Sequence, residues 1–294
     1  MPIINTDFVV PKTPKVMNLI YSIEYICCIL KNYGIYSQYK YIKRRRSVYG
    51  LSIDMIFGMF FSELLEIYLY AINFKFSNLS KLQYSQRYPL VYDTNGNNIP
   101  VSFFLLLNNI ISVTLLFFII KQFKSYYKTE NIHQGLSKVF IVYIFLIIFL
   151  AFASFCICGN KLTGRLNINY IDHLDILLIF QKYFLSSFNM APQLSLNFMC
   201  QYTLGLSSKF ELLLGVSTLL HVIENLILLH SDKLKVVWFK IPINFQSLYT
   251  SCWNLLFISI LLLQSHYFYL NNKVTVPTKK ETKEKNEKEY PKLI

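Results

Sequence analysis

Two uncharged runs decide the fold class: FFLLLNNIISVTLLFFII (Phe103–Ile120) and FIVYIFLIIFLAFASFCI (Phe140–Ile157). A helix needs roughly 20 predominantly apolar residues to cross the hydrocarbon core of a bilayer. Both runs approach that length, and neither contains Asp, Glu, Lys or Arg. The two runs therefore predict transmembrane helices.

The rest of the 294-residue chain has a similar character. It is 54% hydrophobic, only 15% charged, and has a mean hydropathy of +0.38. This composition predicts an all-α polytopic membrane protein with seven transmembrane helices. The expected spans are Val16–Tyr36, Leu51–Phe74, Val101–Ile120, Val139–Gly159, Ile171–Met190, Lys209–Leu229 and Leu248–Tyr269.

The formal net charge of +13 would indicate nucleic-acid binding in a soluble protein. In a membrane protein, Lys and Arg mark cytosolic loops instead, so nucleic acid is not an expected partner. Basic residues gather in the first and third loops, which predicts a lumenal N-terminus and a cytosolic C-terminus. Asn78-Leu79-Ser80 then lies on the non-cytosolic side, and Asn78 is a candidate glycosylation site.

The tail Asn271–Ile294 is rich in Lys and Glu and poor in apolar residues, a composition that predicts disorder. Near its end stands Tyr290-Pro291-Lys292-Leu293. A tyrosine followed three positions later by a bulky apolar residue is the form that adaptor complexes bind. Tyr290 and Leu293 are therefore candidate sorting residues, and an adaptor complex is a possible partner.

Residue patterns for catalysis and metal binding are missing from the sequence. It has no recognisable Ser/His/Asp grouping, no phosphate-binding glycine loop and no convergent Cys/His spacing. The six cysteines fit small packing residues better than a disulfide framework. We therefore expect no enzyme activity, no cofactor and no metal site.

A short pattern occurs twice in the chain. Gln38 is followed twelve residues later by Gly50-Leu51-Ser52, and Gln193 is followed twelve residues later by Gly205-Leu206-Ser207. Parallel repeats of three helices characterise transporters whose halves rock about a central site. The predicted organisation is a lumenal segment (1–15), a first half (16–120), a loop with a linking helix (121–160), a second half (161–270) and a tail (271–294).

These repeats resemble the PQ-loop family, and RRRSVYGLSID (Arg44–Asp54) is similar to the loop of its cystinosin-type branch. The second repeat keeps Pro192, Gln193, Asn197 and Gly205, and Lys182 stands where that branch places a membrane lysine. The resemblance implies alternating-access export of an amino acid, cystine-like or cationic, from lysosome or vacuole to cytosol with protons. The departures from the pattern are Ser37 for proline, Tyr202 for a Lys/Arg-Ser element, Met59 for asparagine and Leu214 for the coupling acid.

Ionisable side chains within spans cost roughly 2.5–3.5 kcal/mol each, so each indicates a partner or a polar cavity. The resemblance implies that Lys182 and Asn197 contact the substrate. It also implies that Pro192, Gln193 and Gln38 form a hinge. Glu24 and Glu66 are further ionisable candidates within spans. The candidates for proton coupling are Glu211, Glu63, Glu224, His221 and Asp54.

Structural alternatives stay open at several of these positions. Lys182 could form a structural ion pair with Glu211 or Glu63 instead of binding substrate. Asp54 could form a structural salt bridge with the Arg44–Arg46 cluster instead of taking part in transport. Two rival functions also remain: a non-transporting relative that acts in trafficking or lipid asymmetry, and an uncoupled sugar carrier. The sugar carrier needs no coupling acid, so Leu214 would be unremarkable in it.

Overall fold

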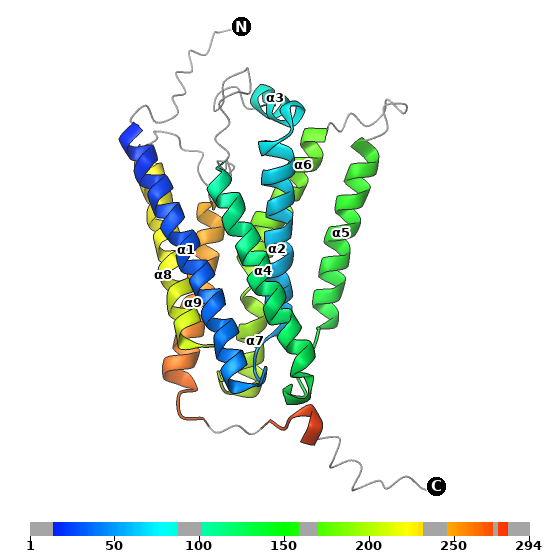
Figure 1. Cartoon of the computed structure of the whole chain (residues 1–294), viewed down its shortest axis with the longest axis vertical. Coiled ribbons are helices and arrows are strands. Elements are labelled where there is room, and N and C mark those ends of the chain that lie inside the picture. The colour runs from blue at the N-terminus through cyan, green and yellow to red at the C-terminus, as the bar shows by residue number, and fades with distance from the viewer. Residues whose placement is uncertain (1–13, 88–101, 159–169, 232–245, 273–275, 282–294) are drawn as a thin grey trace.

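The computed structural model describes residues 14–87, 102–158, 170–231, 246–272 and 276–281, and these are almost entirely helical (Figure 1). Three helices continue directly into π-helical segments, named η1, η3 and η4. The elements are α1 (Pro14–Arg45), α2 (Ile53–Ile67), η1 (Tyr68–Lys75), α3 (Asn78–Arg87), α4 (Phe103–Ser125), η2 (Tyr127–Thr129), α5 (Lys138–Cys158), α6 (Tyr170–Ile179), η3 (Phe180–Ser186), α7 (Ala191–Cys200), α8 (Ser208–Ser231), α9 (Leu248–Leu263) and η4 (Gln264–Phe268).

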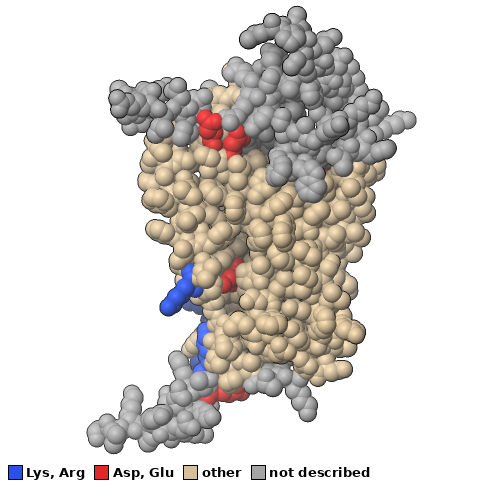
Figure 2. All heavy atoms as spheres, turned by 180° about the vertical axis from the view of Figure 1, so that it is seen from behind, with Lys and Arg blue, Asp and Glu red and all other residues tan. Residues whose placement is uncertain are grey.

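Four of the described helices are long and apolar enough to cross a membrane. They are α4, α5, the Ser208–Ile227 part of α8, and α9 with η4. Their outer faces are apolar: on α5, Val139 is 81% exposed and Phe145 69%. On the face seen in Figure 2, uncharged residues cover most of the side of the bundle, and the Lys and Arg atoms lie in its lower part. An apolar surface of this extent indicates a lipid environment, so the chain is a multi-pass membrane protein.

The helical segments form two groups of three, called triplets: the first is α1, α2 and α4, and the second is η3 with α7, α8 and α9. In the first triplet, α4 packs against both α1 and α2, so it lies between them. In the second, α9 packs against α8 on one side and against η3 and α7 on the other. The triplets face each other because α1 packs along α8 and α2 packs against η3 and α7. Helix α5 packs against α6 and stands at the edge of the bundle (Figure 1).

Helix boundaries differ from the hydropathy pattern in two places. Helix α1 continues to Arg45, beyond the expected end of the first span at Tyr36, because hydropathy marks the bilayer limit and not the end of a helix. The chain between η3 and α7 turns at Asn189 and Met190, and Pro192 lies in the first turn of α7. A proline there leaves no helical hydrogen bond unmade, because N–H groups in a first turn have no intrahelical acceptor.

The turns that join α1 to α2 and α7 to α8 touch each other. Gly50 has a φ of +79°, and a Cβ added to Gly205 would lie 2.0 Å from the carbonyl carbon of Gly50. The rings of Tyr49 and Tyr202 stack beside this contact, with centroids 5.2 Å apart and an interplanar angle of 10°. The two triplets are therefore in direct backbone contact at this end of the bundle.

Within the tail, residues 276–281 contact the loop that follows α4. Thr278 forms an antiparallel bridge with Asn131. The Lys279 backbone N–H donates to the Glu130 carbonyl at 2.8 Å, and its Nζ lies 2.5 Å from Glu130 Oε2. Composition could not predict this, because the partners belong to the loop after α4.

Candidate functional site

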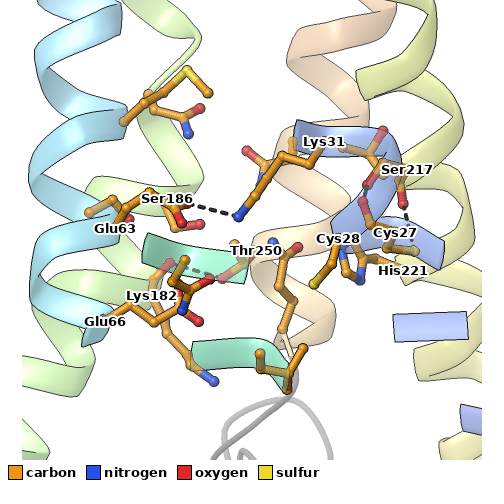
Figure 3. Close-up of a pocket in the computed structure, with 18 of the residues that line it drawn as sticks. Cys27, Cys28, Lys31, Glu63, Glu66, Lys182, Ser186, Ser217, His221 and Thr250 are labelled. Atoms are coloured by element: carbon orange, nitrogen blue, oxygen red, sulfur yellow. Dashed lines mark hydrogen bonds and ion pairs between the residues drawn. The ribbon is translucent and has the colours of Figure 1, made fainter. Parts of the chain in front are cut away.

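A cavity lies inside the bundle where the two triplets meet (Figure 3). Its walls come from α1, α2, η1, α4, η3, α8 and α9, and its volume is about 80 Å³. A buried water needs roughly 10–15 Å³ of such space, so the cavity has room for several waters or a small ion. The ionisable side chains that line it are Glu24, Lys31, Glu63, Glu66, Lys182 and His221.

Lys31 and Glu63 form an ion pair across the cavity. The Lys31 ammonium on α1 lies 2.8 Å from Glu63 Oε1 on α2 (Figure 3). Sequence reasoning considered Lys182 as the partner of Glu63 and missed Lys31. The signal was present, because Lys31 follows Glu24 by seven residues and therefore shares its face of α1.

Lys182 is also buried in the cavity wall, with 4% of its surface exposed. Its ammonium lies 5.6 Å from the centre of the Tyr70 ring, within the range of a cation–π interaction. The Lys182 carbonyl accepts hydrogen bonds from Ser187 Oγ and Thr250 Oγ1, both at 2.9 Å. Side-chain donors thus satisfy this carbonyl. It belongs to the π-helical segment η3, and π-helical turns often occur at functional sites.

Glu66 lies near Lys182 in the same wall (Figure 3). Its Oε2 accepts a hydrogen bond from Gln181 Nε2 at 3.3 Å. Glu63 and Glu66 are three residues apart on α2, and both line the cavity. Glu63 is only 8% exposed.

His221 on α8 lies between two buried carboxylates. Its Nδ1 is 3.3 Å from Glu24 Oε2 on α1 and 3.4 Å from Glu224 Oε2 on α8. Glu24 and His221 line the cavity, and Glu224 adjoins them behind the wall. His221 and Glu224 are neighbours on one helix face through their i,i+3 spacing, while the approach of Glu24 from another helix was not predictable from spacing.

Gln38 connects the first triplet to the α7–α8 turn. Its Nε2 donates to the Gly205 carbonyl at 2.8 Å, and its Oε1 accepts from the Ser207 backbone N–H at 2.8 Å. The side chain is completely buried. Both amide atoms therefore satisfy backbone groups of the opposite triplet.

Gln193 makes the reciprocal connection. Its Nε2 donates to the Gly50 carbonyl at 2.9 Å, and its Oε1 accepts from the Ser52 backbone N–H at 2.7 Å. The two glutamines of the sequence repeat thus occupy equivalent positions. Each binds the turn that follows the other.

Asn197 lies outside the cavity lining. Its Oδ1 accepts a hydrogen bond from Gln193 Nε2 at 2.8 Å, and its Nδ2 donates to Gln264 Oε1 at 3.1 Å. The side chain is 1% exposed. The structure therefore places Asn197 beside Gln193 instead of in the cavity with Lys182.

Two candidates for proton coupling lie away from the cavity. Glu211 accepts a hydrogen bond from Ser265 Oγ at 2.7 Å and lies 3.8 Å from His266 Nε2. Asp54 accepts from the Ser137 backbone N–H at 3.1 Å. No salt bridge joins Asp54 to Arg44–Arg46 within the described residues, so that alternative was wrong. The start of α5, where backbone N–H groups are unpaired, binds this carboxylate instead.

The remaining candidates concern processing and sorting. Asn78 is exposed at the start of α3, so its glycosylation stays a prediction. Tyr290 and Leu293 lie outside the described residues.

Together these features define a class: a multi-pass helical membrane protein with a cavity lined by ionisable side chains. No known family profile matches the chain. A protein of Saccharomyces cerevisiae, the uncharacterized protein YCL002C, is 30% identical over 250 residues, which cover 83% of this chain and 92% of the yeast protein. The chain belongs to the same family as that yeast protein.

Proposed function

We propose that the chain is a seven-span transporter with two PQ-loop-type triplets joined by α5. It exports an amino acid, cystine-like or cationic, from the lysosome or vacuole to the cytosol in symport with protons. The observation that carries this proposal is the buried cavity with ionisable walls at the interface of the two triplets. Charged groups are costly at this depth, and they mark substrate and proton pathways in membrane proteins.

The arrangement of the helices supports the transporter class. Three further segments, α1, α2 with η1, and α6 with η3, run alongside the four apolar helices (Figure 1). In each triplet the third segment packs between the first two. Transporters built from parallel repeats place their substrate site at the repeat interface, where this cavity lies.

The reciprocal glutamines support alternating access. Gln38 and Gln193 hold the two triplets together at one end of the bundle, beside the contact of Gly50 with Gly205. A rocking motion can pivot where the halves are tightly joined. The cavity of about 80 Å³ is smaller than typical ligand pockets of about 300–1,000 Å³, so it fits a closed state that widens on opening.

The charges of the cavity support uptake of a proton or a cationic group. Three carboxylates, two ammonium groups and one imidazole line it, so the lining carries one net negative charge while the imidazole is neutral. Uncompensated charge in a buried site costs several kcal/mol. One proton on His221, or the ammonium group of an amino acid, brings the lining to neutrality.

One observation favours a second candidate, the uncoupled sugar carrier. Leu214 replaces the coupling acid of the cystinosin-type branch, and it lines the cavity as an apolar side chain. A receptor-like relative that acts in trafficking or lipid asymmetry is the third candidate. In such a receptor, no solute would be transported through the cavity.

Uptake of an amino-acid panel into proteoliposomes, with and without an imposed pH gradient, tests the proposal. We expect gradient-stimulated uptake of one class of amino acid and at least a tenfold loss in Lys182→Ala, because this substitution removes the ammonium from the cavity wall. Lys209→Ala, at an exposed position at the start of α8, is the matched control. Equal uptake by Lys182→Ala and wild type would refute the site assignment. Sugar flux insensitive to a protonophore would favour the uncoupled carrier, and no flux would favour the receptor.

A further inference from the structure

One imidazole nitrogen faces two carboxylates in the wall of the cavity. Nδ1 of His221 lies 3.3 Å from Glu24 Oε2 and 3.4 Å from Glu224 Oε2. A ring nitrogen carries at most one hydrogen, which the two carboxylates would have to share. Both separations exceed the roughly 2.7–2.9 Å of a charge-assisted N–H···O bond. The contact with Glu224 is a long hydrogen bond, so neither carboxylate is held tightly by the imidazole.

The same separations fit the ligands of a metal ion. Imidazole nitrogen and carboxylate oxygen bind Zn²⁺ at roughly 2.0–2.2 Å, and a tetrahedral angle then places two ligand atoms about 3.4 Å apart. One ligand atom from each of Glu24, His221 and Glu224 lies within 4.8 Å of the other two. The three side chains can therefore converge on one ion with small adjustments.

A buried oxygen without a donor points to a missing ligand. Oε2 of Glu24, the oxygen that faces His221 Nδ1, has no hydrogen-bond partner among the described residues, although the side chain is only 6% exposed, and the same is true of Oε1 of Glu224, which is 1% exposed. A buried acceptor left unsatisfied costs about 1–3 kcal/mol, and more when it is charged. A cation between the carboxylates would satisfy these oxygens.

The position of the cluster gives an ion both access and charge balance. Glu24 and His221 line the cavity, and Figure 3 shows His221 beside it, so water or a substrate can complete the coordination. With Glu224 included and the imidazole neutral, four carboxylates face two ammonium groups. A divalent ion would bring this set of side chains to neutrality.

We propose that Glu24, His221 and Glu224 bind a divalent transition-metal ion of the Zn²⁺ type, with the cavity supplying its open coordination positions. The nitrogen ligand disfavours Ca²⁺ and Mg²⁺, which prefer oxygen. His221 and Glu224 stand three residues apart in the sequence, but Glu24 comes from a helix of the other triplet, so spacing alone did not indicate the site. The proposal does not depend on transport.

Zinc binding to the purified, chelator-treated protein, measured by equilibrium dialysis with Zn²⁺ alone, tests the site. We expect one Zn²⁺ per chain in the wild type and at least tenfold weaker binding in His221→Gln and Glu224→Gln, because each loses one of three ligands. Glu211→Gln is the matched control, because Glu211 is also a buried α8 carboxylate near a histidine. Wild-type affinity in both triad variants, or no zinc on the folded wild type, would overturn the proposal.

Cobalt binding to the wild type covers the case in which the triad variants do not fold. Co²⁺ bound by nitrogen and oxygen ligands in a four- or five-coordinate site gives stronger visible absorption than a six-coordinate surface ion. We expect such bands to saturate at one Co²⁺ per chain and to disappear when one equivalent of Zn²⁺ is added. Only the weak bands of a six-coordinate ion would contradict the site. Neither measurement involves transport, so its failure is distinct from failure of the proposed function.

Discussion

At the scale of single residues, two glycines set how closely the triplets approach. Gly205 has no space for a side chain, because a Cβ there would lie 2.0 Å from both the carbonyl carbon and the oxygen of Gly50. Gly50 itself has a positive φ, which favours glycine. A larger residue at position 205 must push the two turns apart.

Gly205→Ala should lower the free energy of unfolding by about 3 kcal/mol, the upper range for overpacking, because the clash is with backbone. Gly215→Ala on α8 is the matched control, since its nearest contact would be an ordinary 3.5 Å to Leu262 Cδ1. Thermal unfolding of both variants in the same detergent measures the difference. Similar melting temperatures would show that the close contact does not exist in the protein.

At the scale of elements, the repeat in the sequence indicated Gln38 and Gln193 as a related pair but did not indicate their partners. Gln38 and Gln193 were found from their equal distance to Gly-Leu-Ser. That each binds the other repeat's turn follows from packing between distant helices, which spacing cannot show. The apolar helices were likewise predictable from hydropathy. The pairing of Lys31 with Glu63 was not, because several charged helices offered equivalent partners.

Gln38→Leu and Gln193→Leu should each destabilise the protein by about 2 kcal/mol or more, because each leaves two backbone groups without their buried partner. Gln122→Leu serves as the control, since Gln122 is a buried glutamine with one long bond of 3.3 Å to the Tyr39 carbonyl, within one triplet. Chemical unfolding in detergent gives the three values. An equal loss in all three variants would mean that the reciprocal bonds have no special role.

A protein that carries both Gln38→Leu and Gln193→Leu tests whether the two glutamines act together. The two glutamines bind adjacent turns that touch at Gly50 and Gly205, so their effects should be coupled. We therefore expect the loss in the double variant to differ from the sum of the single losses, as is usual for residues that share one network. Strict additivity would indicate two independent caps instead of one hinge.

At the scale of the whole molecule, the two triplets surround a cavity whose walls carry charged side chains. The reciprocal turns hold the triplets at one end, and the ion pairs of the cavity connect α1, α2 and α8 in the interior. The outer faces are mostly apolar. Composition predicted the membrane class. The cavity required the structure, because its walls come from seven elements spread along the chain.

The central claim is that this cavity carries a solute together with protons, and a whole-cell current measures that directly. Tyr290→Ala is introduced to place the protein at the cell surface, and an amino-acid panel is applied at acidic external pH. The account predicts an inward current with one class of amino acid, cystine-like or cationic, and its loss when Lys182→Ala is added. Silence across the whole panel, with surface expression confirmed, would contradict the account.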